Sequence, residues 1–220
     1  FQTAERPILR TEMPVVTQCG KARLFDFGGV GPAVVFVPSL INPSSILDLD
    51  DDNSMLRWLR TQGLRPLLVD WGTPDSADRG LDLGGHVTNV LQVLLRDLGV
   101  PYHLVGYCLG GTIAVASAVL AEPLSLTLIA TPWNFDGFGN DAVETLQTLW
   151  ENAQPTVDLL GLLPVEILQI AFWLLDPERT VSKYERFGAF PSASAEARAF
   201  IAVEDWANGG APLTQAAARE

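Results

Sequence analysis

The chain has 220 residues, of which 48% are apolar and 18% charged, and 26 acidic against 14 basic side chains give a formal net charge of −12. The apolar fraction excludes a disordered tail, and the negative charge argues against a nucleic-acid-binding protein, which needs clustered lysine and arginine. The length allows one sizeable core plus an elaboration. Two distant cysteines, Cys19 and Cys108, do not make a disulfide scaffold, so we expect a cytoplasmic protein.

Short apolar runs alternate with helical patterns in the first 130 residues. The runs at 34–37, 67–69, 104–105 and 126–130 are typical of strands buried on both faces of a parallel sheet. Helical patterns occupy 55–61, 86–98 and 111–120, and the segments 15–18 and 22–27 indicate an antiparallel hairpin at one edge. This alternation predicts an α/β fold with a mostly parallel sheet and helices on both faces.

The strand–helix alternation stops after residue 131. We expect residues 1–135 to form the N-terminal part of the core, 136–205 a helical cap without strands, and 206–220 the start of a return to the core. The apolar stretch 159–175 is interrupted by Pro164, Glu166 and Gln169 and is shorter than the roughly 20 residues of a membrane span. It predicts a buried or interfacial helix, so no transmembrane segment is expected.

The most informative motif is Gly106-Tyr107-Cys108-Leu109-Gly110-Gly111, which lies between a predicted strand and a predicted helix. It has the nucleophile-elbow pattern G-x-S-x-G with cysteine in place of serine. The glycines leave room for neighbouring backbone at a tight turn. We therefore expect Cys108 to be a nucleophile and the Leu109 N–H to face a developing oxyanion. In the alternative interpretation, Cys108 is one more small, buried apolar residue.

A second loop, Pro38-Ser39-Leu40-Ile41-Asn42, follows the apolar run 34–37. In hydrolases with a nucleophile elbow this position supplies the other oxyanion donor, and the Leu40 N–H is the candidate here. An ordinary turn built on Pro38 and Pro43 explains the same residues equally well. The aspartates at 48–52 lack the glycine and distal glutamate of an EF-hand loop, so we expect no metal site there.

Several motifs, in this order, resemble the polyhydroxyalkanoate (poly-3-hydroxybutyrate) synthases, which have the α/β-hydrolase fold. They lie at 38–42, 46–49, 53–54, 57–59, 69–75, 106–112 and 131–135, with a weaker match at 200–213. The segment Asp70-Trp71-Gly72 is most similar to the shorter synthases that work with a second subunit.

The resemblance implies an acyltransferase that polymerises 3-hydroxyacyl-coenzyme A through an acyl group on Cys108 and releases coenzyme A. The thioester is a substrate, and no cofactor or metal is implied. Ile41, Asn42 and Trp71 would line the pocket, and Tyr107 would add an apolar wall. The implied partners are a second synthase subunit or a homodimer and the surface of a hydrophobic polymer granule. The helix at 159–175 would shield the acyl channel, face the granule, or form the core of the cap.

The acid and the base of the expected triad are missing from the sequence. In this fold the nucleophile is followed by the acid and then the histidine base, but His86 and His103 both precede Cys108. We therefore expect the acid and base to lie beyond Glu220, the chain to be C-terminally truncated, and these 220 residues alone to be inactive. The alternatives are a related hydrolase acting on other esters or thioesters and a catalytically inactive binding scaffold.

Overall fold

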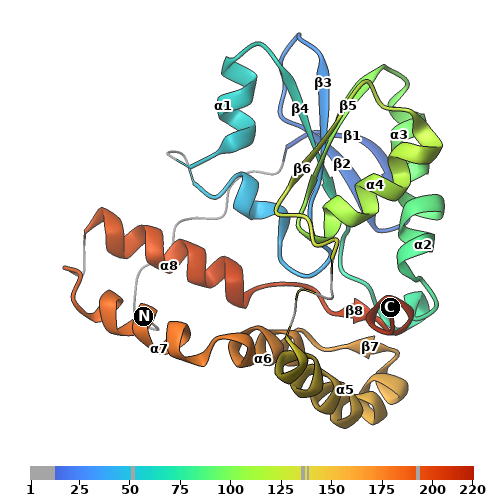
Figure 1. Cartoon of the computed structure of the whole chain (residues 1–220). Coiled ribbons are helices and arrows are strands. Elements are labelled where there is room, and N and C mark those ends of the chain that lie inside the picture. The colour runs from blue at the N-terminus through green and yellow to red at the C-terminus, as the bar shows by residue number, and fades with distance from the viewer. Residues whose placement is uncertain (1–12, 51–52, 135–136, 138, 192–193) are drawn as a thin grey trace.

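The computed structural model describes residues 13–50, 53–134, 137, 139–191 and 194–220. Its main sheet has six strands in the order β1-β2-β4-β3-β5-β6 (Figure 1). The strands are β1 (Val15–Cys19), β2 (Ala22–Asp26), β3 (Ala33–Val37), β4 (Arg65–Asp70), β5 (Tyr102–Tyr107) and β6 (Leu126–Ile129). β3 to β6 are mutually parallel, whereas β2 is antiparallel to both β1 and β4. The predicted parallel sheet with an antiparallel edge hairpin is confirmed.

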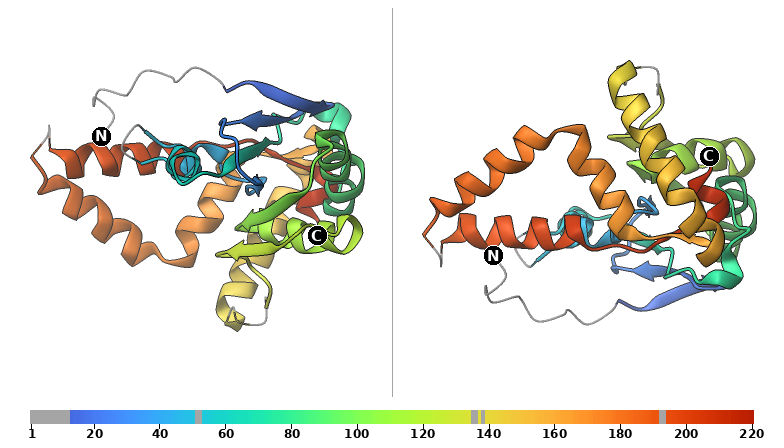
Figure 2. Two further views of the ribbon diagram at one scale, coloured as in Figure 1. Left: turned by 90° about the horizontal axis from the view of Figure 1, so that it is seen from above. Right: turned by 90° about the horizontal axis from the view of Figure 1, so that it is seen from below.

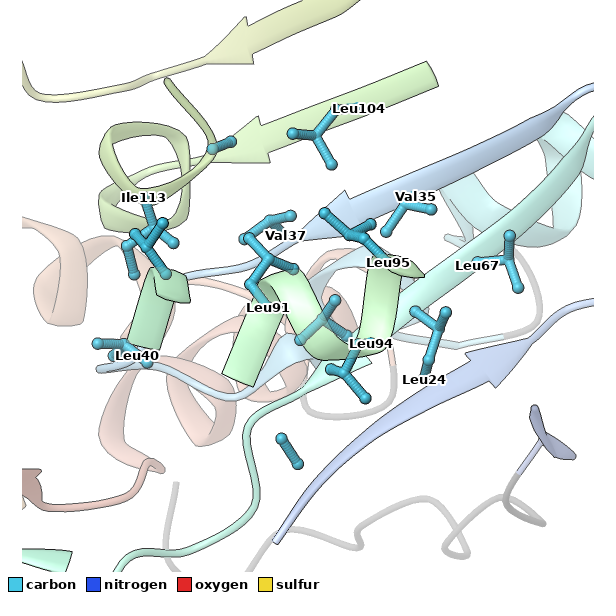
Figure 3. Packing of buried hydrophobic residues seen from close by; sticks show 14 of the residues in the cluster. Leu24, Val35, Val37, Leu40, Leu67, Leu91, Leu94, Leu95, Leu104 and Ile113 are labelled. Carbon is cyan, nitrogen blue, oxygen red and sulfur yellow. The ribbon is translucent and has the colours of Figure 1, made fainter. Parts of the chain in front are cut away.

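Helices cover both faces of this sheet. Helix α1 (Met55–Thr61) lies on one face, and α3 (Gln92–Leu98) and α4 (Leu109–Ala121) lie on the other (Figure 1). β3 alternates between the two: Val35 and Val37 belong to the core cluster under α3 and α4, whereas Val34 and Phe36 belong to the cluster under α1. Figure 3 shows the first cluster. Burial on both faces explains the uninterrupted apolar run in β3.

The helix predicted at 86–98 is part of a longer helical stretch with a change of winding. It consists of α2 (Leu83–Gly85), a π-helical segment (His86–Leu91) and α3. The predicted helix is therefore present, with π winding over its first six residues. His86 and Val87, at the start of the π-helical segment, are both buried. The Asp82 side chain caps the N-terminus of this stretch by accepting the Gly85 N–H.

Residues after β6 are mostly helical, as expected. Helices α5 (Asn140–Leu160), α6 (Val165–Leu175), α7 (Pro177–Gly188) and α8 (Ala195–Asn208) lie beyond one end of the sheet (Figures 1 and 2). Two 3-10 turns, Ser44–Leu47 and Ser76–Asp78, lie in the loops after β3 and β4. Of the α6 side chains, Ile167 and Leu168 pack against the core, whereas Phe172 and Trp173 are exposed.

The prediction of no strand between 136 and 205 is wrong in one place. β7 (Leu162–Leu163) pairs antiparallel with β8 (Leu213–Thr214). Two-residue strands carry no periodicity, so only the pairing across about fifty residues defines them. The short helix α9 (Gln215–Ala218) follows, and the Thr214 Oγ1 hydroxyl donates to the Leu81 carbonyl. Residues after α8 thus pack back against the first half of the chain.

β6 is an edge strand of the described sheet. Leu126 and Leu128 of this strand are exposed, and so are Val119 and Leu120 of the neighbouring helix α4, with Val119 reaching 78%. An exposed apolar edge of this kind favours pairing with another chain.

Candidate active site

Cys108 occupies the sharp turn between β5 and α4. Its φ of 53° and ψ of −133° place a non-glycine residue in the positive-φ region, which costs about 1–3 kcal/mol. The Cys108 N–H donates to the Ile129 carbonyl (2.9 Å), and the Cys108 carbonyl accepts the Gly111 N–H (2.8 Å). Bonds from β6 and from α4 therefore hold the strained turn in place, and the predicted elbow geometry is present.

The glycines around Cys108 are required by close packing. A Cβ on Gly106 would lie 2.8 Å from the Ala114 Cβ. A Cβ on Gly110 would lie 2.5 Å from the Pro38 carbonyl carbon and closer still to the carbonyl oxygens of Val37 and Pro38. A Cβ on Gly111 would overlap the side chain of Thr131. The N-terminus of α4 can therefore press against the loop after β3 only because Gly110 has no side chain.

The loop after β3 runs beside the elbow. Val37 pairs with Gly106 in the parallel register of β3 and β5, so the C-terminal ends of these two strands lie side by side. The Ser39 Oγ accepts the Ile41 N–H (3.1 Å), and the Trp71 Nε1–H donates to the Pro38 carbonyl (3.0 Å). These bonds fix the conformation of the loop that carries Leu40, whose side chain is buried.

A cavity of about 550 Å³ opens beside this loop. Its walls include Leu40, Ile41, Asn42 and Trp71, which the sequence placed at the site. The end of α8 lies over the loop: Asn42 Nδ2 donates to the Ala207 carbonyl (3.3 Å). Among the described residues that line this cavity, Cys108 and the other elbow residues are absent, so the cavity adjoins the loop after β3 rather than the thiol.

A second, smaller cavity of about 240 Å³ contains a residue that the sequence did not place at the site. His86 lines it together with Leu40 and Trp71, and the His86 and Trp71 rings meet edge to face at 5.6 Å and 81°. The His86 Nδ1 lies 2.8 Å from the Asp82 carbonyl oxygen. Burial lowers the pKa of His86 below its usual value, so the ring is neutral at pH 7. The only sequence signal for His86 was its position four residues after Asp82, the N-cap of the helix.

The other histidine lies far from the thiol. His103 is five residues before Cys108 on the extended strand β5, about 16 Å along the chain, and its Nδ1 lies 2.8 Å from the Ser125 Oγ. Tyr107, next to Cys108, is half-buried, and burial together with the Cys108 side chain raises the pKa of Tyr107.

The aspartate-rich segment is tied to its own loop and helix. Asp48 accepts from the Arg57 Nε (2.8 Å) and Nη2 (3.0 Å), and Asp50 accepts the Asn53 N–H (2.7 Å); positions 51 and 52 lie outside the described residues. Within the described ranges, no three His, Cys, Asp or Glu side chains form a group that could hold a metal ion. In the same part of the chain, every helix is too short or too polar to cross a bilayer.

The strand order and the strand–cysteine–helix turn after β5 define an α/β-hydrolase fold with a cysteine at the nucleophile position. Solved structures similar to this chain include an α/β hydrolase from the metagenome of lagoon sediments of Mar Chica, Morocco (TM-score 0.41, 18% identity, 62% of this chain and 58% of that one). Another is an esterase from Exiguobacterium antarcticum (TM-score 0.46, 19% identity, 61% and 53%). No family model matches the chain.

Proteins similar in sequence to this chain indicate a particular family within the α/β-hydrolase fold. The poly(3-hydroxyalkanoate) polymerase subunit PhaC of Haloferax mediterranei is 32% identical, over 94% of this chain and 45% of that protein. The subunit of the same name from Haloarcula marismortui is 32% identical (80% and 39%), and that of Allochromatium vinosum is 28% identical (79% and 50%). The resemblance to polyhydroxyalkanoate synthases is confirmed. The chain spans half or less of the length of these relatives.

Proposed function

We propose that this chain is the nucleophile-bearing part of a polyhydroxyalkanoate synthase, an acyltransferase that polymerises 3-hydroxyacyl groups from their coenzyme A thioesters. The observation that carries the proposal is Cys108, held at positive φ between β5 and α4 in a chain similar to polymerase subunits over most of its length. Strained backbone of this kind clusters at functional sites, and a merely buried cysteine would not require it.

The proposed reaction begins with attack of the Cys108 sulfur on the thioester carbonyl. The new carbon–sulfur bond replaces the bond to coenzyme A, which leaves as a thiol. A hydroxyl group of another 3-hydroxyacyl unit then attacks the acyl-cysteine, which forms an ester and frees the Cys108 sulfur. A thiol suits this role because exchange between thioesters is nearly isoenergetic and cysteine is a strong nucleophile near neutral pH.

Two backbone N–H groups are the proposed oxyanion donors. The Leu109 N–H belongs to the first residue of α4, and the Leu40 N–H lies in the loop that packs against Gly110 through Val37 and Pro38. Preorganised donors of this kind stabilise the charge that develops on the carbonyl oxygen in the transition state. The contact at Gly110 is what brings the two donor segments to the same place.

The base that accepts the Cys108 proton is proposed to come from outside these 220 residues. No histidine follows Cys108 in the sequence, and His103 lies at the opposite end of β5. A carboxylate that orients the base would come from the same source. This division agrees with the chain spanning half or less of its relatives.

The proposed partners follow from the relatives' name and from exposed apolar surface. The relatives are named polymerase subunits, which supports a second subunit or a homodimer. On α6, the exposed side chains Ile170, Phe172, Trp173 and Leu174 form an apolar surface suited to a hydrophobic polymer granule. We accordingly place the protein in the cytoplasm at the granule surface.

The test is turnover of 3-hydroxybutyryl-coenzyme A by the complete gene product, with released thiol and polymer measured separately. Polymer formation that Cys108→Ala abolishes and the control Cys19→Ala retains supports the proposal. Release of coenzyme A without polymer favours the alternative, a related hydrolase. Equal activity in the wild type and Cys108→Ala rules out the acyl-cysteine.

A further inference from the structure

No role has yet been assigned to the smaller cavity. It is enclosed by segments that are distant in sequence: the β1–β2 turn, the end of β4, the π-helical segment and β8. Apolar walls come from Leu40, Trp71, Val90 and Leu213. Leu40, Trp71 and Gly72 also line the larger cavity, so the two cavities share part of their walls.

Several polar groups at this cavity are already paired. The Cys19 thiol donates to the Asn89 carbonyl (3.3 Å), and the Thr214 hydroxyl donates to the Leu81 carbonyl. At the rim, Lys21 Nζ lies 2.6 Å from both Asp75 and Asp78 carboxylate oxygens. The local charges are thus largely matched to each other, which leaves little attraction for a charged ligand.

His86 is the polar residue at this cavity that is not fully paired. Its side chain is only 8% exposed, and its Nδ1 must donate to the Asp82 carbonyl, because a carbonyl oxygen can only accept. In the neutral ring, Nε2 is then an acceptor, and none of the described residues makes a hydrogen bond to it. Because Nδ1 is bonded to the Asp82 carbonyl of the same helical stretch, Nε2 is the ring nitrogen available to a ligand in the cavity. Nε2 is not sealed off from the cavity, so a ligand there can donate the hydrogen bond that the protein does not supply.

We infer that this cavity binds a short apolar ligand segment that carries one neutral hydrogen-bond donor, which His86 Nε2 accepts. The ligand is small, since 240 Å³ lies below the range of sites for drug-sized molecules. Its class rests on the proposed function: the donor is either the 3-hydroxyl of the acyl group or an amide N–H of the coenzyme A arm. His86 is then a specificity-determining residue.

The test uses ¹⁵N-histidine NMR on this chain, which has only two histidines, so His103 serves as an internal reference. Three neutral probes are titrated: ethyl 3-hydroxybutanoate, ethyl butanoate, which lacks the hydroxyl, and N-ethylacetamide. We expect a saturable upfield shift of His86 Nε2 with a donor-bearing probe and none with ethyl butanoate. A response to the hydroxy ester alone identifies the hydroxyl, and a response to the amide alone identifies the amide N–H. No shift, or equal shifts with all three, overturns the inference.

Variants separate the hydrogen bond from packing. His86→Phe keeps an aromatic ring against Trp71 but removes the acceptor, and should weaken binding of the effective probe about 3- to 10-fold, read from backbone amide shifts of the cavity residues. His86→Gln, which retains an acceptor, should bind within twofold of wild type, as should His103→Gln. Equal binding by His86→Phe contradicts the inference. The titration needs no turnover and is repeated in Cys108→Ala, so its result is independent of whether polymer is made.

Discussion

Gly110→Ala tests whether the elbow is built on the contact between α4 and the loop after β3. The added Cβ would lie 2.5 Å from the Pro38 carbonyl carbon and closer still to two carbonyl oxygens, whereas ordinary contacts of this kind are 3.4–4 Å. The opposing atoms are backbone at the end of β3, which is paired on both sides with β4 and β5. They cannot rotate away as a side chain would. We therefore expect a loss of about 3 kcal/mol, the upper end of the usual cost of overpacking.

The assay is urea denaturation followed by circular dichroism. With an m-value of about 1–3 kcal/mol per molar urea, the unfolding midpoint should fall by about 1 M or more. The matched control is Gly80→Ala, because Gly80 has open space at the Cβ position and its φ is not in the positive region. The control should stay within about 0.5 kcal/mol of wild type. If both variants unfold at the wild-type midpoint, the inference that Gly110 is closely packed against the loop after β3 is refuted.

Three further predictions concern other regions. Burial lowers the pKa of His86 in the folded state below 6.5, so below about pH 6.5 the unfolded chain binds more protons than the folded chain. The free energy of unfolding should therefore decrease as the pH is lowered through this range, by up to about 1.4 kcal/mol per pH unit. His86→Phe should remove this pH dependence in urea titrations between pH 5.5 and 7.5. Lys183→Met leaves the buried Glu204 carboxylate with the Tyr184 hydroxyl as its hydrogen-bond donor among the described residues, and should cost about 2 kcal/mol in thermal unfolding. Arg96→Met, which breaks an exposed ion pair, should cost under about 1 kcal/mol, and equal effects of the two variants would contradict this assignment. The exposed edge of β6 should make this chain self-associate, and Leu128→Lys should reduce its apparent mass in light scattering. If the wild type and Leu128→Lys are both monomers, the edge of β6 does not drive association.

Local patterns in the sequence predict most of the sheet and the elbow. The run Val34–Val37 predicts a strand buried on both faces, and the structure distributes its side chains between two core clusters. The glycines around Cys108 predict a crowded turn, and a Cβ on Gly106, Gly110 or Gly111 would meet neighbouring atoms. These features are readable because burial and backbone crowding restrict residue type one position at a time.

Other features depend on which distant segments meet. β7 exists because Leu162 and Leu163 pair with β8, about fifty residues later, and neither two-residue segment has a pattern of its own. His86 was recognisable only as a residue near the start of a helix; its contact with Trp71 and its place in a cavity come from packing between β4, the π-helical segment and β8. Composition and periodicity report whether a residue is buried. They do not report its partners, and a binding site is defined by those partners. The elbow could therefore be predicted from sequence, whereas the cavities beside the loop after β3 required the tertiary structure.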